Sequence, residues 1–396
     1  MLILEFSPMT SCLRKIASHY LLTPQGFQPR PLVTVRLLEE GGHEIVSVEQ
    51  YAEGLDSMEG VEFHSGIICA GFVNAHSHVE LSYLRGAIAE GGGFAAFAES
   101  IGRVRGNFSE EVRLSAIVEA DRAMWAEGVD AVGDIVNGAT SFAIKAASNI
   151  FYRNFVEVFG LRECNLDRQR ELLRYPNSSL TPHSIYSVQE APFREVCGSE
   201  LSQPLSIHFQ ESPAEAQLYR GKGSLHEWYE KVGFRCDFLH YGGPAERIVA
   251  SVPRERSVLL VHNCEITQSD VEQIMNHFTA PVYWVLCPRS NSYISRVEPQ
   301  SVELLRRGGP NINICVGTDS LSSNWTLSMM EELKMFKGVS LAELLQWATI
   351  NGAKALGVED KYGSIEVGKR SGIVNLRGVN LEDFTLTAAS KAVRIL

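Results

Sequence analysis

The 396-residue sequence lacks the features that would place it in a membrane or on nucleic acid. No apolar run approaches the ~20 residues that a membrane-spanning helix needs. The first eight residues carry no basic group before their short apolar stretch, so they make a poor signal peptide. Lys and Arg total 36 against 47 Asp and Glu, and the net charge of −11 argues against a nucleic-acid or anionic-membrane partner. We therefore expect a cytoplasmic protein with neither partner.

Cysteine pairing motifs are also missing. The eight cysteines include no C-x-x-C pair and follow no regular spacing, which argues against a disulfide framework and a cysteine-zinc site. Cys69, Cys264, Cys287 and Cys315 lie in or beside apolar runs, where cysteine usually acts as a small buried hydrophobe. We expect reduced thiols.

The order of apolar runs and helical patterns predicts an α/β fold. The apolar fraction of 45% and charged fraction of 21% are typical of a globular protein with a sizeable core. From residue 67, apolar β-branched runs alternate with helical patterns such as Ser109–Glu127, as in βα units around a parallel sheet. The expected strands are 67–73, 131–136, 151–159, 179–188, 205–211, 257–262, 281–286 and 313–319. Eight such strands predict a (β/α)8 TIM barrel over residues 67–356.

A doubly wound open sheet is the alternative, but neither G-x-G-x-x-G nor a Walker sequence supports it. The two ends of the chain read as β structure. Residues 1–66 contain short strands at 14–22, 32–38 and 44–48. After a capped helix at Ser340–Gly352 come a β segment, Gly363–Leu376, and a last strand, Ala392–Leu396. We expect residues 1–66 and 357–396 to pair into one discontinuous β domain.

Two histidines stand one residue apart where the first predicted strand of the α/β unit ends, in Gly71-Phe-Val-Asn-Ala-His-Ser-His78. On a strand, side chains at i and i+2 share a face, so His76 and His78 can reach one ion. Neutral imidazole is the commonest protein ligand for zinc and similar metals. The alternative is that two polar side chains simply end a strand, so the metal hypothesis needs further ligands.

Those ligands stand at the ends of later predicted strands. His208, His262 and Asp319 each follow an apolar run, and in an α/β barrel the carboxyl ends of all strands share one face. His76, His78, His208 and Asp319 then form a set of three nitrogens and one oxygen, which suits a catalytic divalent metal.

The sequence resembles the amidohydrolase superfamily, in the branch of cytosine-deaminase-like, chlorohydrolase-like (ATZ/TRZ) and purine-nucleoside-type enzymes. The resemblance covers nearly the whole chain in the expected order. Besides the two-histidine segment, the matching pieces are Pro182-His-Ser-Ile-Tyr186, His208-Phe-Gln-Glu211, Val261-His-Asn-Cys264, Cys287-Pro-Arg-Ser-Asn291, Gly317-Thr-Asp-Ser320, Ala348-Thr-Ile-Asn-Gly-Ala-Lys-Ala-Leu-Gly357 and Gly363-Ser-Ile-Glu-Val-Gly-Lys369. The other zinc-deaminase fold needs H-x-E with P-C-x-x-C, which this sequence lacks.

The resemblance implies a barrel with a composite β-sandwich from both termini and one metal ion, zinc in the first place and iron as the alternative. It implies that the metal supplies hydroxide from a bound water. Asp319 would accept the proton of that water, and Glu211 would carry it to the leaving group. His262 resembles the histidine that orients the water and stabilises the developing charge.

Three further residues are candidates for binding substrate. His183 stands where the family places a substrate-facing histidine. Glu80-Leu-Ser82 is similar to the corresponding stretch of aminodeoxyfutalosine deaminases, and this carboxylate would bind an exocyclic amine, a ring N–H or a ribose hydroxyl pair. Arg289 would pair with a substrate carboxylate. For all three, a purely structural role is the alternative.

The expected reaction is hydrolytic deamination of an aminated nitrogen heterocycle, nucleobase- or nucleoside-like, by a cytoplasmic enzyme and possible homodimer. Chlorohydrolase or amidohydrolase action on C–Cl or cyclic C–N bonds is the alternative, because the same metal ligands serve both. A non-catalytic ligand-binding barrel is the remaining hypothesis.

Overall fold

The structure is a computed structural model that describes residues 13–39, 41–52, 59–161, 166–299 and 301–396. The N-terminal eight residues, Cys12 and Cys164 lie outside these ranges. The six described cysteines are free thiols, four of them buried. Among the described residues, no helix has the length and apolar character that a membrane crossing requires.

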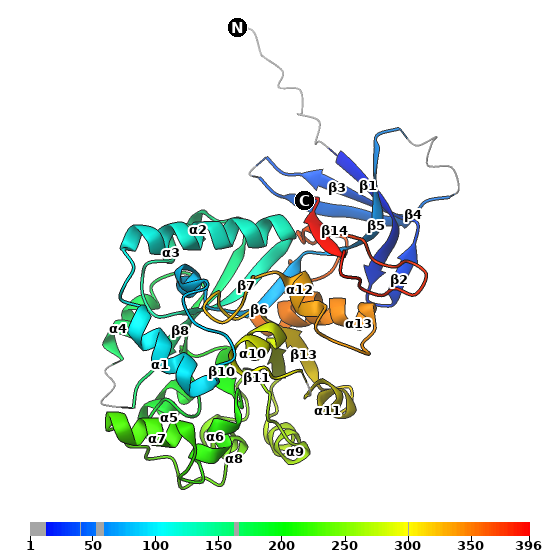
Figure 1. Cartoon of the computed structure of the whole chain (residues 1–396). Helices are drawn as coiled ribbons and strands as arrows, with labels where there is room; N and C mark the ends of the chain where they lie inside the picture. The colour runs from blue at the N-terminus through cyan, green and yellow to red at the C-terminus, as the bar shows by residue number, and fades with distance from the viewer. Residues whose placement is uncertain (1–12, 40, 53–58, 162–165, 300) are drawn as a thin grey trace.

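Both ends of the chain share one seven-stranded sheet, as predicted. The order is β15 (Lys391–Arg394), β14 (Ile373–Arg377), β5 (Val61–Ala70), β1 (Leu13–Thr23), β3 (Pro31–Leu37) and β4 (His43–Gln50), with β2 (Gly26–Pro29) paired to β1. β1 and β5 are parallel and the other pairs antiparallel, so the sheet is mixed. Figure 1 shows the blue N-terminal strands beside the red C-terminal strand, at one end of the α/β unit. The described strands here form a single sheet rather than two facing ones.

The strand predicted at 67–73 is in fact two strands. β5 ends at Ala70 within the terminal sheet, and β6 (Phe72–Ser77) begins the α/β unit. The predicted domain boundary after residue 66 therefore falls inside β5. Gly71 joins the strands where a Cβ atom would lie 2.1 Å from Asp130 Oδ2. Both strands are buried around this joint, so the apolar run continues through it and the sequence pattern does not mark the turn.

The α/β unit contains two four-stranded parallel sheets. One has the order β6, β7 (Val129–Val136), β8 (Phe151–Val158), β9 (Ser178–Pro182), and the other β10 (Leu205–Phe209), β11 (Val258–His262), β12 (Val282–Leu286), β13 (Asn313–Val316). Isolated parallel bridges, Ser77 to Asp319 and Ser184 to His208, link the two sheets at both edges. Buried strand residues such as Val73, Phe155 and Val261 pack together in the core that the two sheets share.

A strand is present at each of the eight predicted positions, but the fourth, the fifth and the eighth end earlier than expected. β9 ends at Pro182, just before His183, and β13 ends at Val316, before Asp319. A Cβ atom at Gly317 would lie 2.8 Å from the carbonyl oxygen of His76, so only glycine lets the chain after β13 pass this close to β6.

Helices connect the strands, and the predicted helices that follow Ser109 and Ser340 are both capped by these serines. α2 (Glu110–Glu127) begins at Ser109, whose hydroxyl accepts from the Val112 N–H, and ends at Gly128, with φ of 107°. α13 (Leu341–Gln346) begins at Ser340 but runs on through a π-helical turn (Trp347–Asn351) and α14 (Gly352–Leu356). The other helices are η2 (Val79–Leu84), α1 (Phe94–Val104), α3 (Phe142–Ala147), α4 (Asp167–Leu172), α5 (Glu190–Gly198), α6 (Pro213–Leu218), α7 (Ser224–Val232), α8 (Pro244–Ser251), α9 (Gln268–His277), α10 (Pro288–Ser295), α11 (Ser301–Arg307) and α12 (Met329–Leu333).

Candidate functional site

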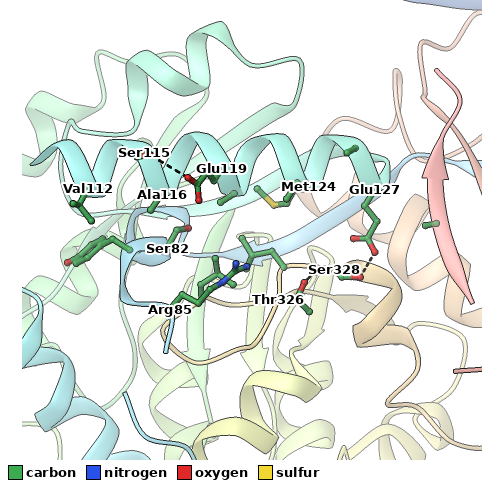
Figure 2. A pocket seen from close by; sticks show the side chains of 17 residues that line it. Ser82, Arg85, Val112, Ser115, Ala116, Glu119, Met124, Glu127, Thr326 and Ser328 are labelled. Carbon is green, nitrogen blue, oxygen red and sulfur yellow. Dashed lines mark hydrogen bonds between the residues drawn. The ribbon is translucent and has the colours of Figure 1, made fainter. Parts of the chain in front are cut away.

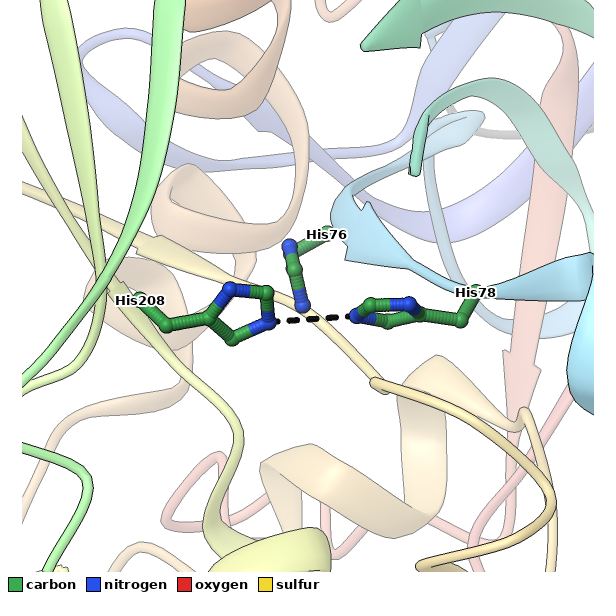
Figure 3. A group of neighbouring side chains, drawn as sticks. All are labelled: His76, His78 and His208. Atoms are coloured by element: carbon green, nitrogen blue, oxygen red, sulfur yellow. Dashed lines mark hydrogen bonds between the residues drawn. The ribbon is translucent and has the colours of Figure 1, made fainter. Parts of the chain in front are cut away.

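Three histidines from two strands converge at the carboxyl ends of the parallel sheets. His76 lies in β6, His78 follows that strand, and His208 lies in β10. Figure 3 shows their imidazoles directed toward one another. The Nε2 atoms of His78 and His208 are 3.1 Å apart, and one ring nitrogen from each histidine lies within 4.8 Å of the others. The structure thus brings together three of the four residues that the sequence proposes as metal ligands.

The histidine cluster has the chemistry of a metal site. Both ring nitrogens of His76 are buried without a hydrogen-bond partner among the described residues. Nδ1 of His208 lies 2.7 Å from the carbonyl oxygen of His183, which requires a proton on Nδ1 and leaves the Nε2 lone pair directed at the cluster. Burial lowers the pKa of His78 to about 3, so its imidazole is neutral at pH 7. Buried, neutral and unpaired imidazoles fit a divalent cation.

Asp319 contributes an oxygen at the edge of this cluster. Its Oδ1 lies 3.6 Å from Nε2 of His78 and 3.9 Å from Nε2 of His76. Its Oδ2 accepts hydrogen bonds from Ser290 Oγ at 2.5 Å and Ser323 Oγ at 2.8 Å. Burial alone would raise the pKa of Asp319, but the facing histidines and the Ser290 hydroxyl outweigh it and hold the pKa below its ordinary value. Asp319 is therefore a carboxylate whose free oxygen faces the histidines.

Glu211 and His262 form a second pair beside the histidines. Glu211 Oε1 lies 3.8 Å from Nε2 of His262. The Nδ1–H of His262 donates to Asn291 Oδ1 at 2.9 Å in the tautomer that leaves Nε2 free to face Glu211. Tyr186 donates from its hydroxyl to Glu211 Oε2 at 3.0 Å. Burial raises the pKa of Glu211 to about 7, which suits a group that takes up and releases a proton near neutral pH.

The backbone around Glu211 is fixed by a buried carboxylate four residues later. Glu215 accepts from the backbone N–H groups of Gln210 at 2.9 Å, Glu211 at 2.5 Å and Ser212 at 3.3 Å. The sequence Ser212-Pro-Ala-Glu215 predicts a capped helix start, and α6 begins there as expected. The same cap thus positions the candidate proton carrier.

Several residues of the site have left-handed backbone conformations. The φ angles are 48° at Gln210, 82° at His262, 57° at Asn263 and 55° at Asp319. Non-glycine residues rarely adopt positive φ, and such strain gathers where function fixes a side-chain direction. This strain occurs at or after the ends of three strands of one sheet, β10, β11 and β13, which supports a functional role for this face.

The three predicted substrate-binding residues have different surroundings. His183 stacks on His208, with ring centroids 4.5 Å apart, and so faces the site. Glu80 uses both oxygens within the protein, accepting from Asn137 N and Ser141 Oγ, each at 3.0 Å.

Arg289 is also engaged by its own neighbours. Nη1 lies 3.7 Å from Glu331 Oε2, and the guanidinium sits 5.1 Å from the centre of the Trp325 ring. Its backbone N–H donates to Glu332. His183 therefore lies against His208 of the cluster, whereas the side chains of Glu80 and Arg289 contact other residues of the protein.

The sequence reasoning missed Glu157. It lies at the end of β8, with Oε1 3.9 Å from Nε2 of His183. Glu157, His183 and His208 also have ligand atoms within 4.8 Å of one another. Burial raises the pKa of Glu157 to about 8. The rule that located His208 and His262, a polar residue where a buried strand ends, applies equally to Glu157.

A cavity of about 680 Å³ lies elsewhere, between η2, α2 and the segment before α12 (Figure 2). Its lining includes Arg85, Glu119, Glu127 and Ser328, but none of the histidines. Glu127 accepts from the Ser328 hydroxyl and the Met329 N–H, and burial raises its pKa to about 7. These contacts join α2 to α12, so the buried Glu127 carboxylate has a structural role.

Comparison with known proteins identifies the family. The model of the amidohydrolase family matches residues 67–394, more than half of the chain. Adenosine deaminase of Helicobacter pylori is 28% identical over 344 residues, covering 82% of this chain and 81% of that protein. 5-Methylthioadenosine/S-adenosylhomocysteine deaminase of Teredinibacter turnerae is 28% identical over 225 residues, covering 53% of this chain and 45% of that protein, so this chain spans less than half of that relative's length.

Solved structures share the fold. Aminofutalosine deaminase of Helicobacter pylori, in complex with methylthio-coformycin, superposes with a TM-score of 0.79 at 24% identity and covers 97% of this chain and 100% of its own. An adenosine deaminase of Xanthomonas campestris with bound zinc has a TM-score of 0.71 at 22% identity and covers 94% and 86%. This chain belongs to the amidohydrolase family and is a hydrolase that acts on carbon–nitrogen bonds.

Proposed function

We propose that this protein removes an amino group from an aminated nitrogen heterocycle, nucleobase- or nucleoside-like, by hydrolysis, and releases ammonia. The observation that carries the proposal is the position of the Glu211–His262 pair, 3.8 Å apart, beside the converging histidines. A metal site with an adjacent buried acid and base suits hydrolysis better than ligand storage. The deaminases among its relatives support this choice of reaction.

The finer architecture belongs to the same proposal. The two parallel sheets are the halves of a (β/α)8 barrel, because bridges link them at both edges and their carboxyl ends carry the site. The terminal sheet is the composite β domain that flanks this barrel.

His76, His78, His208 and Asp319 would hold one divalent ion, zinc in the first place, as their three nitrogens and one oxygen suit it. When bound, such an ion lowers the pKa of a water molecule toward ~7 and so supplies a nucleophile at neutral pH. The zinc-bound structure of the Xanthomonas relative supports this choice of metal.

The side chains of the protein divide the proton transfers among themselves. Asp319 Oδ1 accepts a proton at the metal-binding edge of the site, while its Oδ2 is held by two serine hydroxyls. Glu211 takes up a proton and delivers it to the leaving nitrogen, which a carboxyl with pKa near 7 can do in both directions. His262, whose Nδ1–H is held by Asn291 Oδ1, presents the Nε2 lone pair to the attacking water and orients that water by accepting its hydrogen bond.

The test is ammonia release by zinc-loaded protein across a panel of aminated purines, pyrimidines and their nucleosides. Glu211→Gln removes the proton carrier and should lower kcat by about 10²- to 10⁴-fold with the metal content unchanged. Glu246→Gln changes an exposed carboxylate on α8 and serves as the matched control. Unchanged turnover in Glu211→Gln would show that another group carries the proton. Chloride release from chlorinated analogues of the same heterocycles, with no ammonia from the aminated panel, would replace deamination by dehalogenation.

A further inference from the structure

Glu157 holds a buried carboxylate oxygen that the protein leaves without a partner. The residue is 5% exposed. Its Oε2 accepts from Asn137 Nδ2 at 2.9 Å, whereas Oε1 has no hydrogen bond among the described residues. Buried polar atoms are nearly always hydrogen-bonded, so an unpaired carboxylate oxygen at the end of a strand beside the site indicates a partner that comes from outside the chain. The neighbouring Glu80 differs, because its two oxygens are both taken.

The atom that faces this oxygen is a hydrogen-bond donor. Nδ1 of His183 lies 2.7 Å from Ser187 Oγ, which lies 2.6 Å from Ser184 Oγ. If Ser184 donates to Ser187 and Ser187 donates to His183 Nδ1, each hydroxyl proton has an acceptor. The reverse direction would leave the Ser184 proton without an acceptor among these contacts. The imidazole therefore carries its proton on Nε2, the nitrogen that faces Glu157.

The spacing of the two atoms selects the group that fits between them. Oε1 of Glu157 and Nε2 of His183 are 3.9 Å apart, too far for a direct hydrogen bond. A single oxygen about 2.8 Å from each atom can bridge them, with an angle of about 90° at that oxygen. A hydroxyl group fits either protonation state of Glu157, because it accepts from Nε2–H and can donate to the ionised carboxylate or accept from the protonated carboxyl group.

We propose that Glu157 and His183 together bind one hydroxyl group of the substrate, so that the substrate is a hydroxylated derivative of the heterocycle, a nucleoside rather than a free base. The inference rests on the proposed function and adds its substrate class. The pair adjoins the metal ligands, since His183 stacks on His208, so the hydroxylated part of the substrate lies on the β8–β9 side of the reacting ring.

A second cation is the competing occupant of this position. Glu157, His183 and His208 could together hold a metal, but Nε2 of His208 already lies 3.1 Å from Nε2 of His78 in the other cluster. The buried cation nearby, Lys145, is bound to Asp134 and to Asn154 Oδ1. The observed contacts thus favour a neutral hydroxyl, and metal stoichiometry distinguishes the two occupants.

The experiment measures kcat/KM for adenosine and its 2′-, 3′- and 5′-deoxy analogues with zinc-loaded wild type and Glu157→Gln. In the wild type, one analogue should lose about 10- to 100-fold in kcat/KM relative to adenosine, as expected when a buried polar group is left without its hydrogen-bond partner. With adenosine, Glu157→Gln should lower kcat/KM by a similar factor relative to wild type. With the affected analogue, Glu157→Gln and wild type should have nearly equal kcat/KM, because the substitution and the missing hydroxyl remove the same contact. Glu127→Gln, a buried carboxylate in the cavity wall between α2 and α12, is the control and should behave as wild type.

The outcomes separate this inference from the proposed function. Ammonia release from adenosine and all three analogues at equal kcat/KM would overturn the hydroxyl contact and leave deamination standing. A second metal ion per chain that is lost in Glu157→Gln would also overturn it. Absence of ammonia from every compound would contradict the proposed function. Calorimetric titration of both proteins with inosine and its deoxy analogues then decides the contact, and equal Kd values would end it.

Discussion

Tyr186 donates from its hydroxyl to Glu211 Oε2 at 3.0 Å, while the other oxygen of Glu211 faces His262. Tyr186 follows β9 and Glu211 follows β10, so the contact joins two neighbouring segments at the carboxyl ends of the strands. The carboxylate thereby has one oxygen held by the protein and one free for proton transfer. Burial, which raises the pKa of Glu211 to about 7, is opposed by this hydrogen bond.

Tyr186→Phe should therefore move the pH dependence of the reaction. Without the phenol hydroxyl, the ionised form of Glu211 loses a donor, so its pKa rises further. Because Glu211 must be ionised to take up a proton, kcat/KM rises with pH through this pKa, and the ascending limb should shift to higher pH in the variant. The comparison uses full pH profiles of both zinc-loaded proteins. An unshifted limb, with kcat merely lower at all pH values, would mean that Tyr186 only fills space.

His208→Ala should abolish tight metal binding. The substitution removes one nitrogen of the cluster, and the loss should exceed the roughly 10- to 100-fold that removal of an outer hydrogen-bond partner costs. Elemental analysis after dialysis should find about one metal ion per chain in the wild type and far less in the variant. His277→Ala, on α9, removes a histidine whose Nε2 contacts the Val252 carbonyl and whose ring packs against Phe278, and this variant should keep its metal. Equal metal content in both variants would contradict the ligand assignment.

Much of the site could be predicted because its residues share one rule. His76, His208 and His262 stand where buried apolar runs end, and parallel strands bring such ends to one face. Glu157 obeys the same rule but was overlooked, because a lone glutamate within Phe-Val-Glu-Val-Phe159 resembles the polar half of an alternating strand. Here the residues on both sides of it are buried as well.

Other features could not be read from the sequence because they depend on long-range packing. The division between β5 and β6 arises where Gly71 meets Asp130, and an unbroken apolar run contains no sign of it. The surroundings of Glu80 are a second case, because the Asn137 N–H and the Ser141 hydroxyl, more than fifty residues later, donate to its two oxygens. The β segment expected from Gly363 is a strand only from Ile373. Before that residue, Gly368 and Lys369 exchange backbone hydrogen bonds with Ile45 of β4 without forming a strand.

Lys145→Met should destabilise the fold around the first metal-binding segment. Lys145 Nζ forms a buried ion pair with Asp134, and Asp134 Oδ1 accepts from the Val79 N–H at 2.7 Å, directly after His78. Removing the cation leaves a buried carboxylate without its partner, which costs about 3–5 kcal/mol of unfolding free energy. Denaturant titration measures this loss. The double variant Lys145→Met/Asp134→Asn should recover part of it, and a double variant as unstable as the single one would show that Lys145 acts through packing alone.

Glu127→Gln should change how stability depends on pH. Burial raises the pKa of Glu127 from 4.5 to about 7 in the folded protein. Between these values the unfolded chain has released this proton and the folded chain still binds it, so the wild type loses stability as pH rises through this window. A shift of this size corresponds to at most about 3 kcal/mol, and the variant lacks this contribution. Denaturant titration from pH 4.5 to 8 measures the unfolding free energy of both proteins. The variant should gain stability relative to wild type as the pH rises to ~7, and the difference should stay constant above that pH. A difference that stays level from pH 4.5 upward would show that Glu127 is ionised in the folded protein despite its burial.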